Sequence, residues 1–301
     1  MELYSRWLKG DMIIYPGGSG GGNEFFVDAN FGDDTWAGTS FERPFKTLAV
    51  ALAASHADIA AGSKGWAARN RIYFKGDQTL DAEGETLVLL AQKTDIIGVG
   101  STSSFMQPTL VGNHVPISAT GIGVRFFNMR FRCPAAGGTM FTLNATQRGI
   151  EFHGCTFDAT NTAAATSAII ATAVWFLKIR NCEFVGPFSG PVISILIGNA
   201  QGLAITDNYI ESAAQGVLFA TGVTCSPKKI LVAGNTMITG TECIVDTDET
   251  VVEIVNNTLT TLQAKGVSGV GAVVANEFLA AGNKITASDL ANADWPVLGT
   301  V

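Results

Sequence analysis

Hydrophobic and polar positions alternate in a phrase of eight residues that recurs seven times between Val124 and Ile285. The first and third positions are apolar in every copy, apart from the small Ala280, and the eighth position is apolar in all. A period of two predicts a β-strand with one buried face. The copies begin 22 to 27 residues apart, at Val124, Ile150, Leu177, Leu203, Ile230, Val252 and Phe278. Self-similarity at such a period predicts a solenoid.

The fifth position of the phrase holds only Gly, Asn or Asp, the residues that tolerate a left-handed backbone. Its seven occupants are Asn128, Gly154, Asn181, Asp207, Gly234, Asn256 and Gly282. We therefore expect a strand, a one-residue bend with positive φ, and a second strand. The next side chain should point inward, so that Asn208, Asn235, Asn257 and Asn283 stack about 4.8 Å apart and hydrogen-bond along the stack.

Coils whose strands pair only with the coils above and below define a parallel β-helix. The predicted fold is all-β, a single-stranded right-handed parallel β-helix of about nine coils, since parallel crossovers are nearly always right-handed. The segments 72–76 and 94–98 fit the phrase, with Gly76 and Gly98 at the bend, and are assigned to the first two coils. Residues 100–121 and 158–173 are expected to form longer turns between strands.

Four regions follow from this pattern: an extended arm with a Gly-rich linker (1–26), a cap segment with a helix (27–70), the β-helix (71–290) and a C-terminal tail (291–301). In the cap segment Phe45, Leu48, Leu52 and Ile59 have helical spacing, and Pro44 precedes them. A helix here would cover the open edge of the first coil, which would otherwise invite end-to-end pairing.

The start of the cap segment resembles the opening of right-handed parallel β-helix proteins of the pectate-lyase-like superfamily. The matching residues are Val27, Asp28, Gly32, Asp34, Gly38, Thr39, Pro44, Phe45, Lys46 and Thr47. The resemblance implies the fold. It leaves the function open, because the superfamily includes polysaccharide lyases, hydrolases, esterases and phage tailspikes.

Composition narrows the function classes. A formal net charge of −7 with 15% charged residues leaves no basic field for nucleic acid. No apolar run is long enough to span a membrane, and the first residues lack the features of a secretory signal. The five cysteines show no metal-binding spacing, and no cofactor is expected. Cys155 and Cys182 share the inward corner column, where we expect buried thiols, with a disulfide as the alternative.

Charged residues at outward positions mark a candidate glycan-binding face. Stacking should place Arg125, Glu151 and Lys178 in one row, and His153 and Arg180 in another. One interpretation is a groove for a carbohydrate or an acidic ligand, and the other is a solvated face of alternating charges, worth little per pair.

Two acidic pairs lie outside that face. Asp246 and Asp248 would lie about 7 Å apart on one side of a strand, a separation that suits an inverting glycosidase, unless they form an acidic turn. Asp33 and Asp34 suit an Asx turn better than a calcium loop.

Apolar residues at two places predict assembly. The arm carries Trp7, Leu8, Ile13, Ile14 and Tyr15 ahead of the Gly-rich linker. The later coils have a poorly charged flank, Leu231, Ala233, Val255, Leu279 and Ala281. Exposed apolar surface usually marks an interface, so the expected partners are other virion proteins or further copies of the chain, a trimer included.

The sequence therefore predicts a non-enzymatic structural or adhesion subunit of a bacteriophage virion, made in the host cytoplasm. It would be a tailspike-like rod or a capsid decoration protein, acting through protein contacts and surface glycan. The alternative is a polysaccharide lyase or glycoside hydrolase of the pectate-lyase-like superfamily. No catalytic residue and no metal ligand is assigned.

Overall fold

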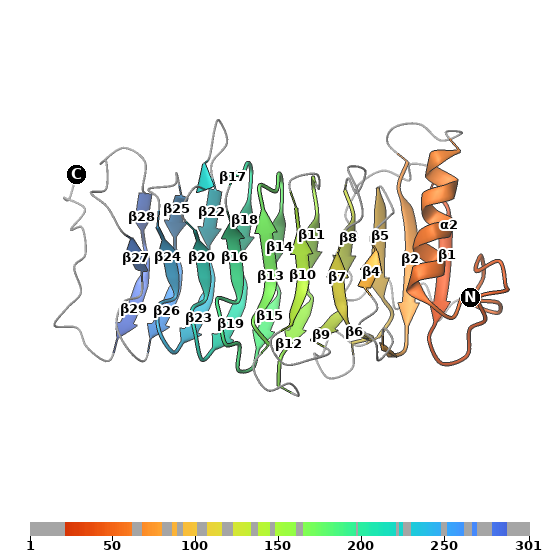
Figure 1. Ribbon diagram of the computed structural model, residues 1–301, viewed down its shortest axis with the longest axis horizontal. Coiled ribbons are helices and arrows are strands. Elements are labelled where there is room, and N and C mark those ends of the chain that lie inside the picture. The colour runs from red at the N-terminus through yellow and green to blue at the C-terminus, as the bar shows by residue number, and fades with distance from the viewer. Residues whose placement is uncertain are drawn as a thin grey trace.

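The computed structural model shows a parallel β-helix (Figure 1). It describes residues 22–61, 68–79, 86–88, 93–100, 107–115, 123–133, 138–144, 148–160, 165–196, 198–220, 223–224, 230–247, 252–261, 267–269 and 279–287. Strands from successive coils stack along the long axis of a rod, with the helix α2 (Leu48–Ala60) at the N-terminal end. The predicted all-β parallel fold class is thereby confirmed, whereas the number of coils differs from the nine predicted.

Three parallel sheets form the walls of the rod, and one of them carries the candidate site. This first sheet has ten strands among the described residues. They are β1 (Glu24–Asp28), β2 (Asn70–Lys75), β5 (Thr94–Gly98), β8 (Arg125–Phe127), β11 (Glu151–His153), β14 (Lys178–Arg180), β18 (Ala204–Thr206), β22 (Ile230–Ala233), β25 (Val252–Val255) and β28 (Leu279–Ala281).

The second sheet follows the bend of each phrase and has nine described strands. They are β3 (Gln78–Thr79), β6 (Thr109–Val111), β9 (Arg130–Arg132), β12 (Thr156–Asp158), β15 (Glu183–Val185), β19 (Tyr209–Ser212), β23 (Thr236–Thr239), β26 (Thr258–Thr261) and β29 (Lys284–Ala287).

The third sheet has eight described strands, and a two-stranded sheet pairs β17 (Gly198–Asn199) with β21 (Val223–Thr224). The eight are β4 (Thr86–Val88), β7 (Asn113–Val115), β10 (Thr139–Leu143), β13 (Ser167–Thr172), β16 (Ile193–Leu196), β20 (Val217–Phe219), β24 (Ile244–Asp246) and β27 (Val267–Gly269). The sequence phrase did not predict this wall. Strands β6 and β7, and strand β13, also fall inside the two segments expected to be longer turns, so that expectation was wrong.

The bend between the first and second sheets is the one that the phrase predicts. All seven fifth-position residues have positive φ, from 51° at Asn181 to 68° at Gly234. Gly76 behaves likewise at φ 84°. Gly98 does not: it ends β5, and a Cβ atom there would lie 1.9 Å from the carbonyl oxygen of Asn128 in the next coil. Close backbone approach, and not a bend, is the reason for a glycine at this position.

The inward corner column forms an amide ladder. Asn208 Nδ2 donates to Asn235 Oδ1 at 2.9 Å, Asn235 Nδ2 to Asn257 Oδ1 at 2.9 Å, and Asn257 Nδ2 to Asn283 Oδ1 at 3.0 Å. Each Nδ2 also donates to a backbone carbonyl, as Asn235 does to Ile205 at 2.9 Å. Each Oδ1 accepts a bond from a backbone amide of the preceding coil, and in Asn235, Asn257 and Asn283 this bond is the second one. The ladder is therefore saturated, as a buried polar column must be.

A second left-handed column occurs at five described positions, each one residue before a strand of the first sheet or before the phrase that contains it. Lys93, Gly123, Gly149, Phe176 and Gly202 have φ between 46° and 76°. The backbone amide of Gly149 donates to the carbonyl of Trp175 at 2.8 Å, and the amide of Phe176 to that of Gln201 at 2.7 Å. Coil-to-coil pairing holds Lys93 and Phe176 in a conformation that their side chains do not favour, so sequence reasoning missed this column.

Stacked apolar side chains fill the rod. Phe126 and Phe152 stack at 5.2 Å between ring centroids, and Phe157 and Phe184 at 4.5 Å. All four rings are fully buried. Cys133, Cys155, Cys182 and Cys243 are buried free thiols, as expected for the corner pair. Desolvation raises the pKa of the Cys182 thiol well above its ordinary value, and the neighbouring Cys155 thiol adds to the rise.

Two details of the N-terminal cap, the start of its first strand and the start of its helix, differ from the sequence expectation. Strand β1 begins at Glu24, inside the range assigned to the arm, because Phe25 and Phe26 are buried against the first coil. Helix α2 begins at Leu48, with Thr47 as its N-cap, whereas Phe45 lies before it and forms a bridge with Val27. The helix buries Leu48, Ala51, Leu52 and Ser55. Within the described chain, no helix has the length and apolarity needed to cross a membrane.

Candidate functional site

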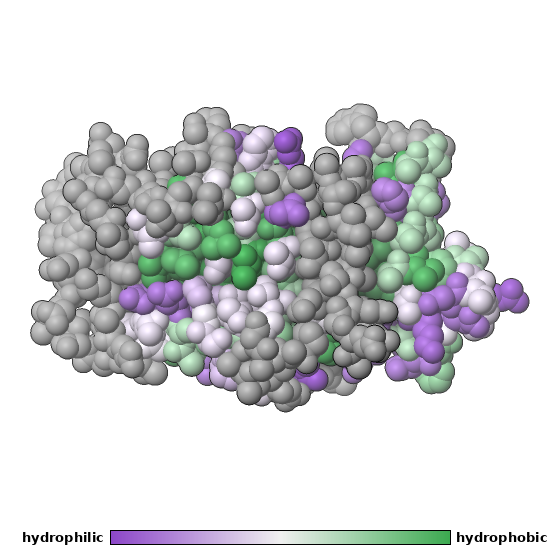
Figure 2. All heavy atoms as spheres, in the orientation of Figure 1, coloured by the Kyte–Doolittle hydropathy of each residue, from purple (hydrophilic) through white to green (hydrophobic). Residues whose placement is uncertain are grey.

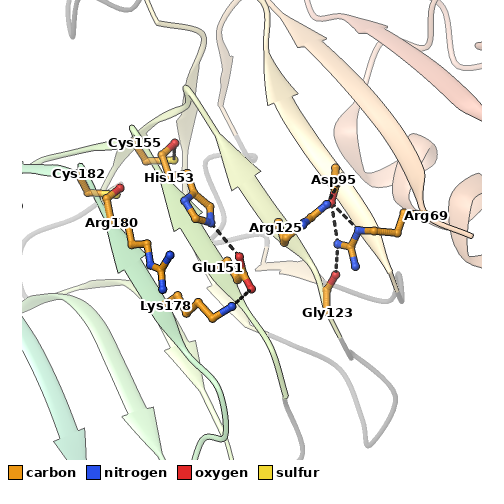
Figure 3. Close-up of polar contacts among 10 residues, drawn as sticks. All are labelled: Arg69, Asp95, Gly123, Arg125, Glu151, His153, Cys155, Lys178, Arg180 and Cys182. Atoms are coloured by element: carbon orange, nitrogen blue, oxygen red, sulfur yellow. Dashed lines mark hydrogen bonds and ion pairs between the residues drawn. The ribbon is translucent and has the colours of Figure 1, made fainter. Parts of the chain in front are cut away.

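Parallel register creates two outward rows of side chains on the first sheet, and their central part forms the candidate site (Figure 3). The outer row runs Glu24, Arg71, Asp95, Arg125, Glu151, Lys178 along consecutive strands. The predicted row of Arg125, Glu151 and Lys178 is thus present, and it extends further toward the N-terminal end. Acidic and basic residues alternate along it, so each carboxylate has a cation in a neighbouring coil.

Asp95 accepts hydrogen bonds from two arginine side chains. Arg125 donates to it twice, Nε to Oδ1 at 2.7 Å and Nη2 to Oδ2 at 2.6 Å. Arg69 donates to Asp95 Oδ1 from Nη2 at 2.6 Å, and its Nη2 also donates to the carbonyl of Gly123 at 2.6 Å. The Asp95 side chain is only 9% exposed. Its two oxygens are therefore occupied by guanidinium groups.

Glu151 is the second carboxylate of the central row and contacts Lys178 and His153. Lys178 Nζ donates to its Oε1 at 2.7 Å, and His153 Nε2 lies 2.9 Å from its Oε2. Desolvation by burial acts to raise the pKa of Glu151, but hydrogen bonds from His153 and Lys178 outweigh it and lower the pKa to about 2. Glu151 is therefore ionised at neutral pH and cannot donate a proton.

The inner row is apolar and aromatic toward the N-terminal end. It runs Phe26, Tyr73, Ile97, Phe127, His153, Arg180, Thr206. Phe26 and Tyr73 stack at 5.3 Å, and Phe127 and His153 stack at 5.0 Å. Phe26, Tyr73 and Ile97 form a hydrophobic cluster separate from the interior of the rod. Sequence reasoning identified His153 and Arg180 in this row but missed the apolar members before them.

Arg180 ends the aromatic run and differs from the other cations of the face. It is half-buried, and its Nε is buried without a hydrogen-bond partner. Among the described residues, no carboxylate forms an ion pair with its guanidinium. The neighbouring Lys178 already engages Glu151, as Figure 3 shows. The face therefore has one cation without a counter-ion in the part of the chain that the structure describes.

The two central carboxylates of the face, Asp95 and Glu151, are both paired with cations. A glycoside hydrolase needs one carboxyl group that is protonated near neutral pH. Asp95 is held by two guanidinium groups, and the pKa of Glu151 is lowered. Among the described residues, no cluster of three His, Cys, Asp or Glu side chains could hold a metal ion.

Only some of the remaining candidate residues lie in the part of the chain that the structure describes. Trp7, Leu8, Ile13, Ile14, Tyr15 and Asp248 lie outside the described residues, and Asp246 ends β24. Leu231, Ala233 and Val255 are half-buried on the first sheet, where Glu253 follows Leu231 in the outer row. Leu279 and Ala281 continue these rows in β28.

The cap segment uses its aspartates as turn and cap acceptors. Asp33 accepts hydrogen bonds from the backbone amide and the hydroxyl of Thr35. Asp34 accepts bonds from the backbone amides of Lys46 and Thr47 and from the Thr47 hydroxyl. The contacts of Asp33 fit the Asx-turn interpretation, whereas those of Asp34 join two distant parts of the cap segment.

One polar cluster was not predicted. Asp158 in β12 is fully buried, and it is bonded by Arg130, by Arg132 Nε at 3.1 Å and by the amide and hydroxyl of Thr160. Desolvation acts to raise the pKa of Asp158, but these hydrogen bonds lower it. The cluster joins adjacent coils of the second sheet, and only the coil register could have revealed it from the sequence.

No protein-family model and no curated protein matches the chain. Among solved structures it is similar to the cedar pollen major allergen Jun a 1, with 11% identity, a TM-score of 0.42, and coverage of 93% of this chain and 82% of that one. It is also similar to a GH136 lacto-N-biosidase from Eubacterium ramulus, with 8% identity, a TM-score of 0.34, and coverage of 88% and 68%. A third is PfbA, a surface adhesin of Streptococcus pneumoniae, with 11% identity, a TM-score of 0.29, and coverage of 79% and 86%.

These likenesses carry no functional argument at such identities and TM-scores. The pairing of strands in the three sheets defines the class on its own: the chain is a parallel β-helix protein. Its described candidate site is a charge-paired face on the first sheet, with an aromatic run beside it.

Proposed function

We propose that this β-helix is a non-enzymatic structural or adhesion subunit, of the kind that a bacteriophage virion carries, and that its first sheet contacts surface glycan. The observation that carries the proposal is the state of the two carboxylates on the face. Both Asp95 and Glu151 accept charge-assisted hydrogen bonds from cations in neighbouring coils. Such pairing fixes side chains for binding and removes the general acid that hydrolysis needs.

Exposed aromatic residues at the N-terminal end support the assembly part of the proposal. Phe31 is 78% exposed, Phe41 44% and Trp36 36%. All three belong to the part of the cap segment that precedes α2 in the chain, and the ring centroid of Phe41 lies 3.9 Å from that of Phe26. Large aromatic side chains that remain exposed commonly belong to protein interfaces. In sequence this end follows the arm that carries Trp7 and Tyr15, so an interface with a neighbouring subunit would include both.

The third sheet adds an outer row in which three of the four residues are apolar. Register places Ile170, Ser194, Leu218 and Val245 side by side on β13, β16, β20 and β24. Figure 2 shows green, apolar side chains gathered over these strands in the middle of the view. Ile170 and Leu218 are half-buried, so the row has apolar surface available for contact. The flank inferred from the sequence lies on the first sheet, and this second apolar row lies on a different wall.

The test is to measure binding and cleavage on the same polysaccharides. Purified full-length protein is incubated with a panel of neutral and acidic bacterial polysaccharides, and bound and released material is sized by mass spectrometry. The proposal predicts that polysaccharide is retained and recovered at its original length. Shortened chains that disappear with Glu151→Gln would overturn it in favour of a hydrolase. Unsaturated products that disappear with Arg180→Ala would favour a lyase.

A further inference from the structure

Arg180 is the one cation of the central candidate face that forms no ion pair with a described carboxylate. Each other cation of the central face contacts a carboxylate: Arg69 and Arg125 contact Asp95, and Lys178 contacts Glu151. Arg180 Nε is buried and has no acceptor. A buried N–H without a partner is unfavourable, and a shift of the side chain toward an incoming oxygen would remove that penalty.

The neighbours of Arg180 in the coil stack provide further hydrogen-bonding groups. His153 precedes Arg180 in the row, and Thr206 follows it. Thr206 is half-buried, and its hydroxyl forms no hydrogen bond with another described residue. Adjacent strands lie about 4.8 Å apart, so the row offers polar groups at a spacing close to the length of a sugar ring. Phe127, stacked on His153, adds an apolar edge.

Local charge favours an anion although the chain as a whole is acidic. The face around Arg180 has four cations, Arg69, Arg125, Lys178 and Arg180, and three carboxylates, Asp95, Glu151 and the exposed Asp207 that follows Thr206. The full chain has a formal net charge of −7. A local excess of cations on an acidic protein attracts an anionic ligand to one place, and the attraction weakens with salt.

We propose that Arg180 anchors a subsite for the oxyanion group of an acidic saccharide, with Thr206 as its second donor. The group is a uronate carboxylate or a sulfate ester, since a guanidinium fork binds either through paired N–H groups. Neutral sugars would lack this contact. The proposal rests on the glycan-binding role of the first sheet and adds the chemical class of the ligand.

The experiment is a calorimetric titration of the full-length protein with matched oligosaccharides. One arm uses an oligogalacturonate, the second a sulfated galactan oligomer, and the third a neutral galactan oligomer of the same length. We expect the acidic oligomers to bind at least tenfold more tightly than the neutral one, with affinity falling as salt increases. The better of the two acidic arms identifies the oxyanion.

Substitutions distinguish a specific contact with Arg180 from a nonspecific effect of positive charge on ligand binding. Arg180→Gln should weaken acidic binding about tenfold or more, and Arg180→Lys should restore only part of it, because an ammonium group lacks the planar fork. Arg71→Gln is the matched control, since Arg71 lies on the same sheet, exposed, and pairs with Glu24. Circular dichroism confirms that each variant keeps its fold.

The outcomes distinguish this inference from the proposed function. Equal affinity for neutral and acidic oligomers, unchanged by Arg180→Gln, overturns the Arg180 subsite and leaves a glycan-binding face. Acidic binding that falls equally with Arg71→Gln reduces the effect to bulk charge and also overturns the subsite. Cleavage of any oligomer during the titration contradicts the non-enzymatic function, whether or not Arg180 binds its oxyanion.

Discussion

Single residues determine where this chain bends. In each of the seven phrases a Gly, Asn or Asp adopts the positive φ that the bend between the first and second sheets requires. Asn181 and Asp207 adopt φ values of 51° and 58° at the bend, where most side chains would be strained. The next residue turns inward, and in the later coils it is an Asn that bonds to its counterparts above and below. The bend and the ladder thus occupy neighbouring positions and support each other.

The amide ladder gives the first prediction. Replacement of Asn235 by Leu removes a partner from both Asn208 and Asn257 in a fully buried column. We expect the free energy of unfolding to fall by about 1–3 kcal/mol, the usual cost of a buried polar group left without a partner. Urea denaturation followed by circular dichroism measures it. Thr258→Val, at an exposed position of the next coil, should change stability little; an equal loss in both variants would refute the ladder's role.

Glu151 gives a prediction about pH. Its pKa in the folded chain is about 2, below its ordinary value of 4.5. The unfolded chain therefore binds a proton at higher pH than the folded chain does. The resulting stabilisation is fully present above about pH 5 and is lost as pH falls from the ordinary pKa toward 2.

Glu151→Gln should remove that dependence. We expect it to lower the free energy of unfolding by about 1–2 kcal/mol at pH 7, after allowing for solvent screening, and to have little effect near pH 2. Chemical denaturation at a series of pH values measures this. Glu24→Gln is the control, because its pair with Arg71 is exposed. A stability difference between wild type and Glu151→Gln that is the same at pH 7 and pH 2 would contradict the linkage.

At the scale of elements, the sequence predicts some walls of the rod better than others. The first and second sheets follow from the phrase, since both its strands flank a bend that only Gly, Asn or Asp occupies. The third sheet was missed because its strands, such as β10 and β13, share no repeated phrase and follow segments of variable length. The second bend column was missed for a related reason: backbone pairing, and not residue type, imposes it at Phe176.

The candidate site likewise has some features that the sequence predicts and others that it does not. Register follows from the phrase, so the row of Arg125, Glu151 and Lys178 could be predicted. Which cation contacts which carboxylate depends on side-chain conformation. The absence of a described carboxylate partner for Arg180 could therefore not be predicted from the sequence. Arg69 lies outside the phrase, and its bond to Asp95 becomes visible only once the coils are stacked.

The cap helix gives the prediction at this scale. Leu52 is fully buried in α2, which packs on β1 and β2. Leu52→Ala should cost about 2–4 kcal/mol of unfolding free energy, because it leaves a cavity over the first coil. It should also increase self-association in sedimentation velocity, since the covering of the first coil's edge is weakened. Ala53→Ser, on the exposed side of the helix, should do neither, and a similar response in both would contradict the capping role.

The whole molecule is a rod that carries the helix α2 at its N-terminal end, and we propose that the subunit is attached at this end. The exposed aromatic residues of the cap segment favour the N-terminal end as the proposed attachment side. The charge-paired face with Arg180 lies further along the rod, on the first sheet. A rod of this kind can hold a glycan-binding face at a distance from the particle that carries it.

Deletion of residues 1–22 tests the attachment. These residues precede β1, so we expect the shortened chain to keep the circular dichroism spectrum and the cooperative unfolding of the full chain. We expect it to lose incorporation into assemblies, because Trp7, Leu8 and Tyr15 are the proposed anchors. Incorporation is measured by co-sedimentation with particles purified after expression of either form. Normal incorporation of the shortened chain would contradict the role of the arm.

The central claim is that the protein acts as a bound subunit and not as a free enzyme. The most direct measurement is immunogold electron microscopy of a sedimented lysate that contains the native protein, with an antibody raised against the folded β-helix. We predict that gold labels discrete particles and that the protein sediments with them. Protein found only in the particle-free supernatant, in a form that shortens polysaccharide, would contradict the account.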